Sequence, residues 1–252
     1  MKMVRTSILY IIVLAHIWAF SKKEDDRDLS FYMPKTIDSL EIIDHTNYIL
    51  GYSEIHEQAA WVLYSLDINK MNPEVSRKND FRSDPLVSTE SAHPNDYKKS
   101  GFDRGHLSPA ADNKINEDIM SESFFMSNMS PQKPYFNRGV WRMLEERVRK
   151  YAEDKGPLII LTAGVLQDSL ENIGTNEVSI PEYYYKVIYA TEYEKTIGFL
   201  LKNESSSDPL ESFMVTVDSI ESITKIDFFV QFEDLIENKM ESDLDSTFWK
   251  IL

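Results

Sequence analysis

"GFDRGHLSPAAD", residues 101–112, places an aspartate, an arginine and a histidine within four positions, beside a glycine. A histidine has an unperturbed pKa of about 6.5, so it can act as an acid or a base near neutral pH. An arginine can bind a phosphate or a carboxylate through two parallel hydrogen bonds. Such a tetrad is by itself more often an ordinary surface loop. Whether Asp103, Arg104 and His106 carry chemistry therefore depends on the rest of the chain.

The chain has 252 residues, which suits one large domain with a substantial core. It contains no cysteine, which excludes disulfides, thiol catalysis and cysteine-based zinc sites. Strand-like and helix-like segments follow one another without a regular βαβ alternation, which predicts an α+β fold. No repeat or inter-domain linker is evident, so we expect a single domain over residues 22–252.

Residues 1–21 have the pattern of a secretory signal peptide. Lys2 and Arg5 precede an apolar run, and small residues at positions 19 and 21 precede the charged stretch "KKEDDRD". The run is short for a membrane span, although an uncleaved N-terminal anchor is the alternative. We therefore expect an exported protein, periplasmic or secreted, without stable membrane association after the signal is cleaved.

The formal net charge of −15 argues against a protein that coats nucleic acid electrostatically. The charge is uneven, however. Residues 204–246 contain twelve acidic residues and two lysines, whereas residues 101–150 contain eight basic residues against seven acidic ones. A local site for a polyanion is therefore compatible with the region around residues 103–106.

The strongest helical pattern lies in "NRGVWRMLEERVRKYAED", residues 137–154, and predicts a helix that starts near Asn137. Apolar residues recur there at steps of three and four, at Val140, Trp141, Leu144, Val148 and Tyr151. Gly156 and Pro157 should end this helix. Buried strands are predicted around residues 59–66, 158–166, 177–190 and 195–203. A short helix is expected in residues 217–229, with Asp218 as its N-cap.

Four short segments are each weak evidence alone but are informative as an ordered set: "SRKNDFRSDP" (76–85), "DRGH" (103–106), "SNMSPQ" (127–132) and "NRGVWRMLEE" (137–146). In this order they resemble the DNA/RNA non-specific endonucleases, a ββα-metal nuclease family, most densely over residues 77–147. The resemblance implies a central, mostly antiparallel sheet flanked by helices. It also implies an active site in which two antiparallel strands and a helix hold one hydrated metal ion.

The resemblance assigns roles to five residues. His106 would be the general base that activates water, and Asn137 the protein ligand of Mg²⁺, for which Mn²⁺ or another divalent ion may substitute. Eight residues of ideal helix place Glu145 about 12 Å along and about 80° around from Asn137, so we do not expect both side chains to bind one ion directly. Because a glutamate side chain leans toward the N-terminus of its helix, Glu145 would instead hold a metal-bound water. Asp103 would orient its neighbours, and Asn128 would fix the loop of His106.

Arginines would supply the positive charge of the site. Arg104 could pair with a phosphate oxygen. By resemblance, residues 76–85 contribute a further catalytic arginine that stabilises developing negative charge. Arg77 is our choice for it, with Lys78 and Arg82 as competitors.

We therefore expect a Mg²⁺-dependent endonuclease that hydrolyses DNA and RNA with little sequence specificity, because such enzymes contact the phosphate backbone. It would act as a monomer or homodimer. A catalytically silent domain that binds polyanions or a protein partner is one alternative. A phosphodiesterase acting on small phosphoesters is another.

Overall fold

The computed structural model describes residues 28–36 and 39–250; the predicted signal peptide, residues 1–21, lies outside this part of the chain. Its centre is a seven-stranded sheet in which every neighbouring pair is antiparallel. In spatial order, the strands are β12 (Met214–Val215), β11 (Lys195–Lys202), β10 (Tyr183–Ala190), β7 (Leu158–Gly164), β4 (Gln58–Leu66), β3 (Tyr48–Ser53) and β2 (Glu41–Asp44).

The middle of the sheet is buried on both faces. All residues of β7 are buried, and Tyr183 is the one exposed residue of β10. Both strands are rich in β-branched and aromatic residues, which pack well on a pleated surface. Helices therefore have to cover both faces of the sheet.

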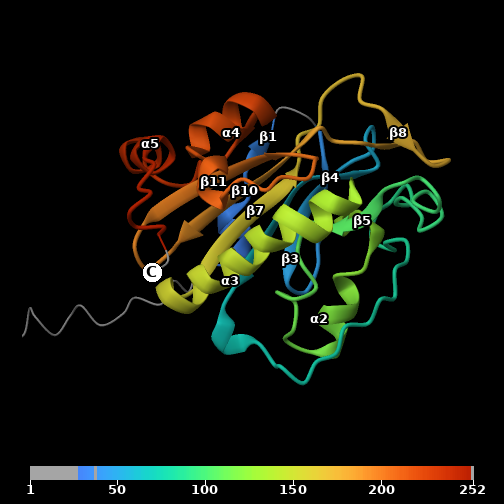
Figure 1. Cartoon of the computed structure of the whole chain (residues 1–252), viewed down its shortest axis with the longest axis horizontal. Helices are drawn as coiled ribbons and strands as arrows, with labels where there is room; N and C mark the ends of the chain where they lie inside the picture. Colours follow the sequence, from blue (N-terminus) through green and yellow to red (C-terminus); the bar gives the residue numbers. More distant parts are fainter. Residues whose placement is uncertain (1–27, 37–38, 251–252) are drawn as a thin grey trace, which may run out of the picture.

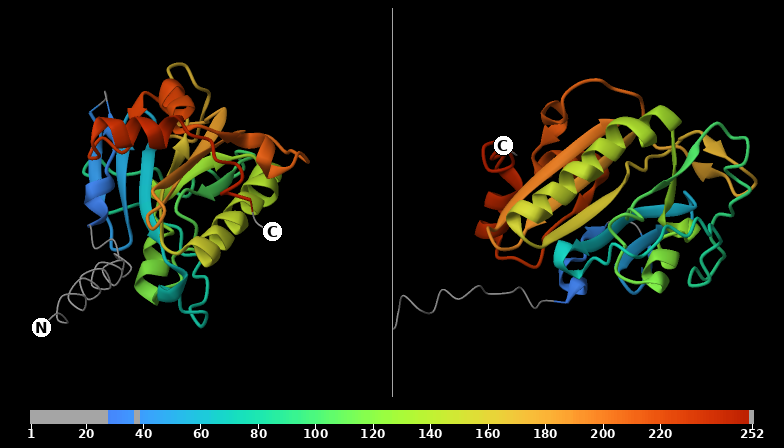
Figure 2. Two further views of the ribbon diagram at one scale, coloured as in Figure 1. Left: turned by 90° about the vertical axis from the view of Figure 1, so that its left-hand side faces the viewer. Right: turned by 60° about the horizontal axis from the view of Figure 1, so that its bottom comes forward.

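Helix α3 (Arg142–Lys155) covers one face, and α4 (Val217–Thr224) and α5 (Asp234–Ser242) cover the other. Lys186 of β10 lies near the Trp141 ring that precedes α3, whereas Gly198 of β11 lies against Ile220 of α4. Lys186 pairs with Phe199, so Gly198 must point to the opposite side of the sheet. Figure 1 shows α3 lying across the sheet, and Figure 2 shows the same layers from two further directions.

The shorter elements surround this sheet. They are the helical turns Leu29–Tyr32, Ile68–Lys70, Met126–Asn128 and Leu210–Phe213, the helix α2 (Glu117–Glu122), and the two-stranded pairs β1 (Lys35–Thr36) with β13 (Ile226–Asp227) and β8 (Asn172–Ile173) with β9 (Val178–Ser179). Within the described ranges, no helix is both long and apolar enough to cross a bilayer.

The α+β fold with a mostly antiparallel sheet is confirmed. The predicted apolar stripe of the long helix is also buried, at Val140, Trp141, Leu144, Val148 and Tyr151. The helix ends at Lys155, and Gly156 follows with a φ of 78°, a conformation that glycine adopts without strain.

Two predicted helix starts are wrong. Thr216, not Asp218, caps α4, since the Thr216 hydroxyl accepts a hydrogen bond from the Ser219 N–H. Asp218 lies in the first turn, where its charge suits the helix dipole. The long helix begins at Arg142, because residues Phe136–Trp141 form a π-helical turn that is kinked at Gly139 (φ −106°, ψ −111°).

The kink changes the geometry expected for Asn137 and Glu145. A separation calculated for an ideal helix does not apply across a π-helical turn with one non-helical residue. Single π-helical turns occur frequently at functional sites. The backbone at Asn137 is therefore shaped by this turn rather than by α3.

Replacing Trp141 with alanine is expected to destabilise the protein by about 3–5 kcal/mol, as for other buried aromatic residues. Trp141 is fully buried, and its ring lies 5.4 Å from that of Phe136 and 5.6 Å from that of Tyr184. Urea unfolding gives the change in free energy. Met143→Ala, at an exposed position of α3, is the matched control. A loss for Trp141→Ala as small as that of the control would contradict this role in the core.

Candidate active site

The predicted DRGH segment forms strand β5 (Asp103–His106), which pairs antiparallel with β6 (Met129–Gln132). His106 lies opposite Met129 in this pair. Gly105 is required for close packing, because a Cβ there would lie 2.2 Å from the side chain of Gln132. The π-helical turn and α3 follow β6, so that two antiparallel strands and a helix meet here.

Asn128 fixes the backbone directly after His106. Its Oδ1 accepts from the Ser108 N–H at 2.8 Å, and its Nδ2 donates to the Ser108 carbonyl at 2.9 Å. The same Nδ2 also donates to the Ser123 carbonyl at 2.8 Å. Asn128 is fully buried, so these bonds replace the water that its amide loses on folding.

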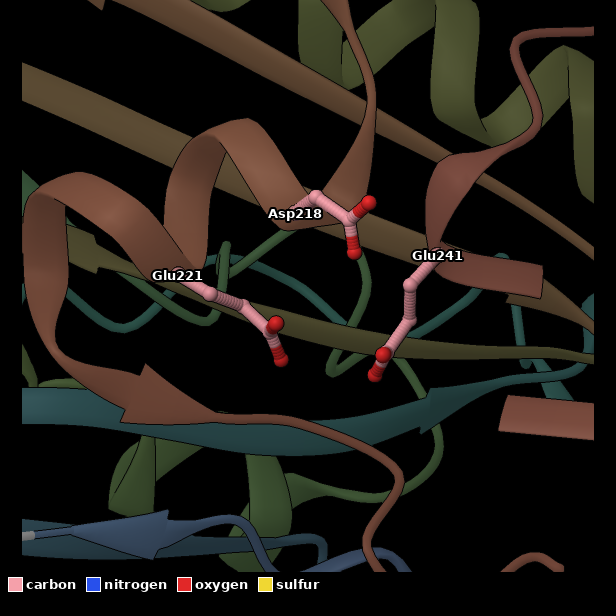
Figure 3. Close-up of side chains that lie close together, drawn as sticks. All are labelled: Asp218, Glu221 and Glu241. Atoms are coloured by element: carbon pink, nitrogen blue, oxygen red, sulfur yellow. The ribbon is translucent and has the colours of Figure 1, made fainter. Parts of the chain in front are cut away.

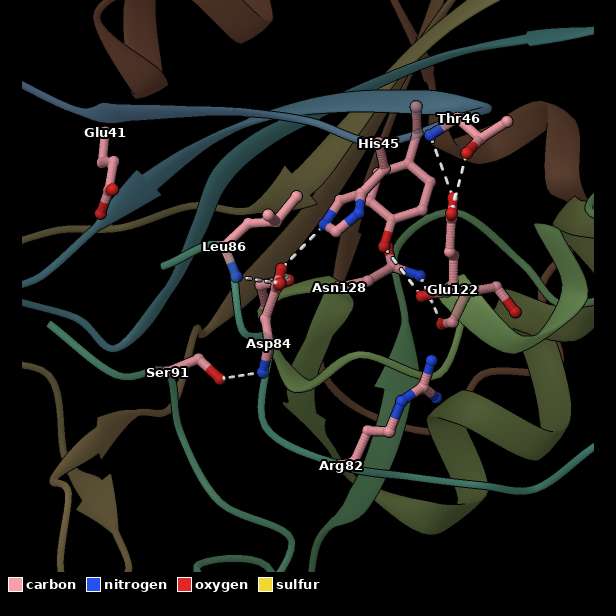
Figure 4. Close-up of polar contacts among 12 residues, drawn as sticks. Glu41, His45, Thr46, Arg82, Asp84, Leu86, Ser91, Glu122 and Asn128 are labelled. Carbon is pink, nitrogen blue, oxygen red and sulfur yellow. Dashed lines mark hydrogen bonds and ion pairs between the residues drawn. The ribbon is translucent and has the colours of Figure 1, made fainter. Parts of the chain in front are cut away.

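Two polar contacts connect the turn that contains His45 and Thr46 to neighbouring parts of the chain (Figure 4). His45 Nε2 lies 2.8 Å from Asp84 Oδ2 in a buried pair. Glu122 accepts hydrogen bonds from the backbone N–H and the hydroxyl of Thr46, at 3.0 and 2.8 Å. These contacts join the turn after β2 to the loop of residues 84–91 and to α2.

His106 is buried between two aromatic rings. Its ring centroid lies 4.9 Å from that of Phe124, edge to face, and 5.7 Å from that of Phe81. Burial and the nearby positive charge of Arg77 lower the pKa of His106 to about 3. Its Nε2 has no hydrogen-bond partner among the described residues. The imidazole is therefore neutral at physiological pH, and its Nε2 is shielded from solvent with its hydrogen-bonding capacity unused.

Arg77 is the member of segment 76–85 that faces this site. Its guanidinium lies 4.9 Å from the centroid of the Phe124 ring, on which His106 also packs. It lowers the pKa of His106 and interacts electrostatically with Glu145. Arg77 therefore lies within electrostatic reach of both the strand and the helix of the site.

The two competing basic residues are engaged elsewhere. Lys78 pairs with Glu117. Arg82 donates to the Asp80 carboxylate and to the Ser121 carbonyl, and its guanidinium lies 4.0 Å from the Phe125 ring centroid.

Arg104 occupies the same face of β5 as His106. Its guanidinium lies 5.1 Å from the Phe81 ring centroid, and its Nη2 donates to the Pro94 carbonyl at 2.7 Å. Its Nε is buried and has no partner among the described residues. One side of the guanidinium is thus held by the protein, and one donor is unused.

Asp103 connects β5 to the π-helical turn. Its Oδ2 accepts from Asn137 Nδ2 at 2.9 Å, and its two carboxylate oxygens accept from Arg138 at 2.8 and 2.6 Å. A carboxylate can only accept, so the contact fixes which end of the Asn137 amide carries the NH₂ group. The carbonyl oxygen Oδ1 of Asn137 is thereby turned away from Asp103.

Glu145 interacts electrostatically with a group of charges between α3 and the sheet. Arg149 donates to Asp112 at 2.7 Å, and the Tyr64 hydroxyl donates to the same carboxylate at 3.1 Å. Lys186 is fully buried, has no hydrogen-bond partner among the described residues, and lies 5.0 Å from the Trp141 ring centroid.

These charges act on one another. Burial raises the pKa of Glu145, and the negative charge of Asp112 raises it further, while Lys186, Arg149 and Arg77 oppose the shift. Burial lowers the pKa of Lys186, against the attraction of Glu145 and Asp112.

Asp112, Arg149 and Lys186 contribute to this site but were not predicted from the sequence. Arg149 follows Glu145 by four residues and shares its helix face, which was a usable signal. Lys186 interrupts the apolar strand "YYYKVIYA", and a lysine at a central strand position indicates a buried charge. Asp112 is the last residue of the stretch 101–112, but no feature of the sequence marked it as part of the site.

Comparisons with known proteins identify the family. Residues 28–235 match the family described as DNA/RNA non-specific endonuclease. The chain is 35% identical to the mitochondrial Nuclease EXOG of Danio rerio over 204 residues, which are 73% of this chain and 60% of that protein. It is 31% identical to the mitochondrial Endonuclease G of Homo sapiens over 192 residues, which are 69% and 65% of the two chains.

A crystal structure of the EndoG/EndoGI complex has the same fold. The TM-score is 0.74 at 28% identity, and the match covers 81% of this chain and 91% of that chain. The matched segments span about 60% of the length of the curated relatives. Because the family match includes most of the chain, the chain belongs to the DNA/RNA non-specific endonuclease family, as the motifs of residues 77–147 predicted.

Proposed function

We propose that this protein is a metal-dependent endonuclease that hydrolyses phosphodiester bonds of DNA and RNA with little sequence specificity. The observation that carries the proposal is the buried, neutral His106, whose Nε2 lacks a partner among the described residues, in the electrostatic reach of Arg77. A neutral imidazole beside a fixed positive charge can take a proton from water next to a bound phosphate. Membership of the family supports this assignment.

Asn137 suits a hydrated Mg²⁺ ion, and Mn²⁺ or another divalent ion would serve in its place. Its amide NH₂ group donates to Asp103, so its oxygen Oδ1 is left as a hard donor. Mg²⁺ commonly keeps several waters and takes few protein oxygens. When bound, the ion would neutralise charge on the phosphate and on the leaving oxygen.

The chain's own residues divide the remaining work. His106 removes the proton from the attacking water through Nε2. Glu145 would hold a water of the bound ion, and the charges of Lys186 and Arg149 favour its ionised form. Asp103 holds the Asn137 amide in a single orientation, and Asn128 holds the strand end that carries His106.

Arg77 and Arg104 would bind the phosphate. Arg77 is exposed, so its guanidinium is accessible to a phosphate, and it lies within electrostatic reach of His106 and Glu145. The guanidinium of Arg104 is oriented by the hydrogen bond from its Nη2 to the Pro94 carbonyl and would add positive charge beside the phosphate. Contacts of this kind read the backbone of a nucleic acid and not its bases.

We further propose that residues 22–252 act as one nuclease domain and that the protein is exported after cleavage of residues 1–21. The signal-like composition of those residues supports export. The two relatives described above are mitochondrial proteins by name, which favours a mitochondrial location instead. N-terminal sequencing of the protein recovered from each cell fraction decides between them.

The test of the function is cleavage of supercoiled plasmid and of RNA by the purified protein, in Mg²⁺ and in EDTA. We expect metal-dependent nicking of the plasmid and degradation of the RNA. Tight binding to a duplex without cleavage in any divalent metal would indicate a binding domain instead. Hydrolysis of a small chromogenic phosphodiester, with both polymers left intact, would indicate a phosphodiesterase.

Arg77→Ala is expected to lower the cleavage rate by about 10²-fold, the range found when one donor to a transition state is removed. Lys78→Ala is the matched control, because it removes a neighbouring positive charge that pairs with Glu117. Initial rates on plasmid at saturating Mg²⁺ give the comparison. Equal losses in the two variants would contradict the assignment of Arg77 to the phosphate.

The acid limb of the pH–rate profile is expected to follow Glu145 and not His106. The pKa of His106, lowered to about 3, keeps its imidazole neutral across the neutral range. The pKa of Glu145 is raised, so the carboxyl gains its proton above the usual glutamate pKa of about 4.3, and the rate falls there as pH decreases.

Glu145 would hold a water of the ion, so the charge of a bound cation should disfavour the protonated carboxyl and move the limb to lower pH as the Mg²⁺ concentration rises. Rates measured between pH 4 and 9 at several Mg²⁺ concentrations test this. An acid limb near pH 6.5 whose position does not change with the Mg²⁺ concentration would assign the titration to His106 instead.

A further inference from the structure

Three carboxylates meet where α4 crosses α5, outside the site described above. Asp218 and Glu221 come from α4, and Glu241 comes from α5 (Figure 3). One oxygen of each residue lies within 4.8 Å of the others. In Figure 1, α4 and α5 lie together at one side of the molecule, away from β5 and α2.

Glu241 gives the cluster its unusual character. It is 6% exposed, and its Oε1 is shielded from solvent without a hydrogen-bond partner among the described residues. In Figure 3 the carboxylates of Glu221 and Glu241 lean toward each other, and that of Asp218 lies above them. A buried carboxylate oxygen without a partner is costly, because it has lost the hydration of the unfolded state.

No cation of the described part of the chain neutralises the cluster. None of the ion pairs found there includes Asp218, Glu221 or Glu241. Glu221 accepts a hydrogen bond from the Phe228 N–H at 2.7 Å, and its carboxyl also lies within hydrogen-bonding reach of Glu241. Glu241 also lies one residue before the end of α5, where the helix dipole disfavours a negative charge.

The neighbouring acids add to the repulsion. Asp227 raises the pKa of Glu221, and Asp227 and Glu237 both raise that of Glu241, in addition to burial. The cluster therefore requires either bound protons or a bound cation at neutral pH.

We propose that Asp218, Glu221 and Glu241 bind a divalent cation of the size of Ca²⁺, which joins α4 to α5. Ca²⁺ takes oxygen ligands at about 2.3–2.6 Å, so two ligands on opposite sides can be about 4.6–5.2 Å apart. The corresponding limit for Mg²⁺, with bonds of about 2.1 Å, is about 4.2 Å. The three carboxylate oxygens all lie within 4.8 Å of one another, so one Ca²⁺ ion can contact all of them.

The exposure of the three residues also suits Ca²⁺. Asp218 is exposed and Glu221 is half-buried, so the cluster is open to water on one side and closed by Glu241 on the other. Ca²⁺ in proteins commonly completes its six to eight ligands with water. The site is structural and separate from the cleavage chemistry.

Thermal unfolding of the full chain in Ca²⁺ and in EDTA tests the proposal. The Asn137→Ala background is used so that an ion in the nuclease site does not contribute. We expect saturating Ca²⁺ to raise the unfolding temperature by at least about 3 °C, as binding to the native state alone requires. Mg²⁺ at the same concentration should raise it less.

Asp218→Asn in the same background is expected to abolish this shift, as is Glu241→Gln. Asp218 is exposed, so Asp218→Asn should fold even if the buried substitution does not. Glu237→Gln, an acid on α5 outside the cluster, is the matched control and should keep the shift. With Asn137 intact, Asp218→Asn should cleave plasmid in Mg²⁺ at the wild-type rate.

Calorimetric titration with Ca²⁺ supplies the second measurement. Absence of both heat and a shift in the Asn137→Ala protein would overturn the proposal, and so would a shift that survives Asp218→Asn. An unfolding temperature that rises as pH falls and does not change with Ca²⁺ would mean that the carboxyls of the cluster are protonated and bind no cation. These outcomes are independent of nuclease activity, so failure of one proposal leaves the other standing.

Discussion

His106→Ala is expected to lower the rate of plasmid cleavage by about 10²–10⁴-fold, the contribution usual for a general base. The loss follows from the removal of the neutral Nε2 that accepts the proton of the attacking water. Substrate binding should change little, because the charges of Arg77 and Arg104 remain. The decrease should therefore appear in kcat, measured by initial rates over a range of substrate concentrations.

His93→Ala is the matched control, since His93 is an exposed histidine. His106 packs on Phe124 and Phe81, so the fold of the variant is checked by circular dichroism. His106→Gln, which better fills the space, should be equally inactive. Partial recovery of His106→Ala by added imidazole would support the role of base. Retention of wild-type activity in either variant would contradict it.

Asn137→Ala is expected to raise the Mg²⁺ concentration needed for half-maximal activity by at least about tenfold and to lower the maximal rate. Losses of 10–100-fold accompany even the removal of groups that only orient a metal ligand. Asn137 would contribute the amide oxygen that Asp103 leaves free. Rates measured across a Mg²⁺ titration separate the two effects.

Asn172→Ala, at an exposed asparagine, is the control for this experiment. Asp103→Asn provides a second comparison, because an amide can no longer pair with Arg138 as a carboxylate does. It should disturb the metal dependence in the same direction as Asn137→Ala. An Asn137→Ala protein with an unchanged Mg²⁺ dependence would show that the ion is held elsewhere.

The sequence predicted well those features that depend on regular periodicity. The α+β class, the buried central strands and the apolar stripe of the long helix all followed from the spacing of apolar residues. The family followed from four short motifs in a fixed order. In each case the information lies within a few consecutive turns or strands of the chain.

The sequence failed where local rules compete. The start of the long helix was placed near Asn137, but Gly139 and the π-helical turn delay the regular helix to Arg142. The cap of α4 was assigned to Asp218, but Thr216, two residues earlier, has the extended backbone that a cap requires. Propensity alone does not distinguish between such neighbouring candidates.

The sequence by itself determined the fold class, the family and the residue types available for catalysis, because these depend on local pattern and motif order. Only the tertiary structure decided which charges share a site. It turned Arg77 toward His106, occupied Lys78 and Arg82 with other partners, and buried Lys186 beside Glu145. The physical reason is that charges interact through space and burial strengthens their interaction. The residues that set each pKa come from segments that are far apart in the chain.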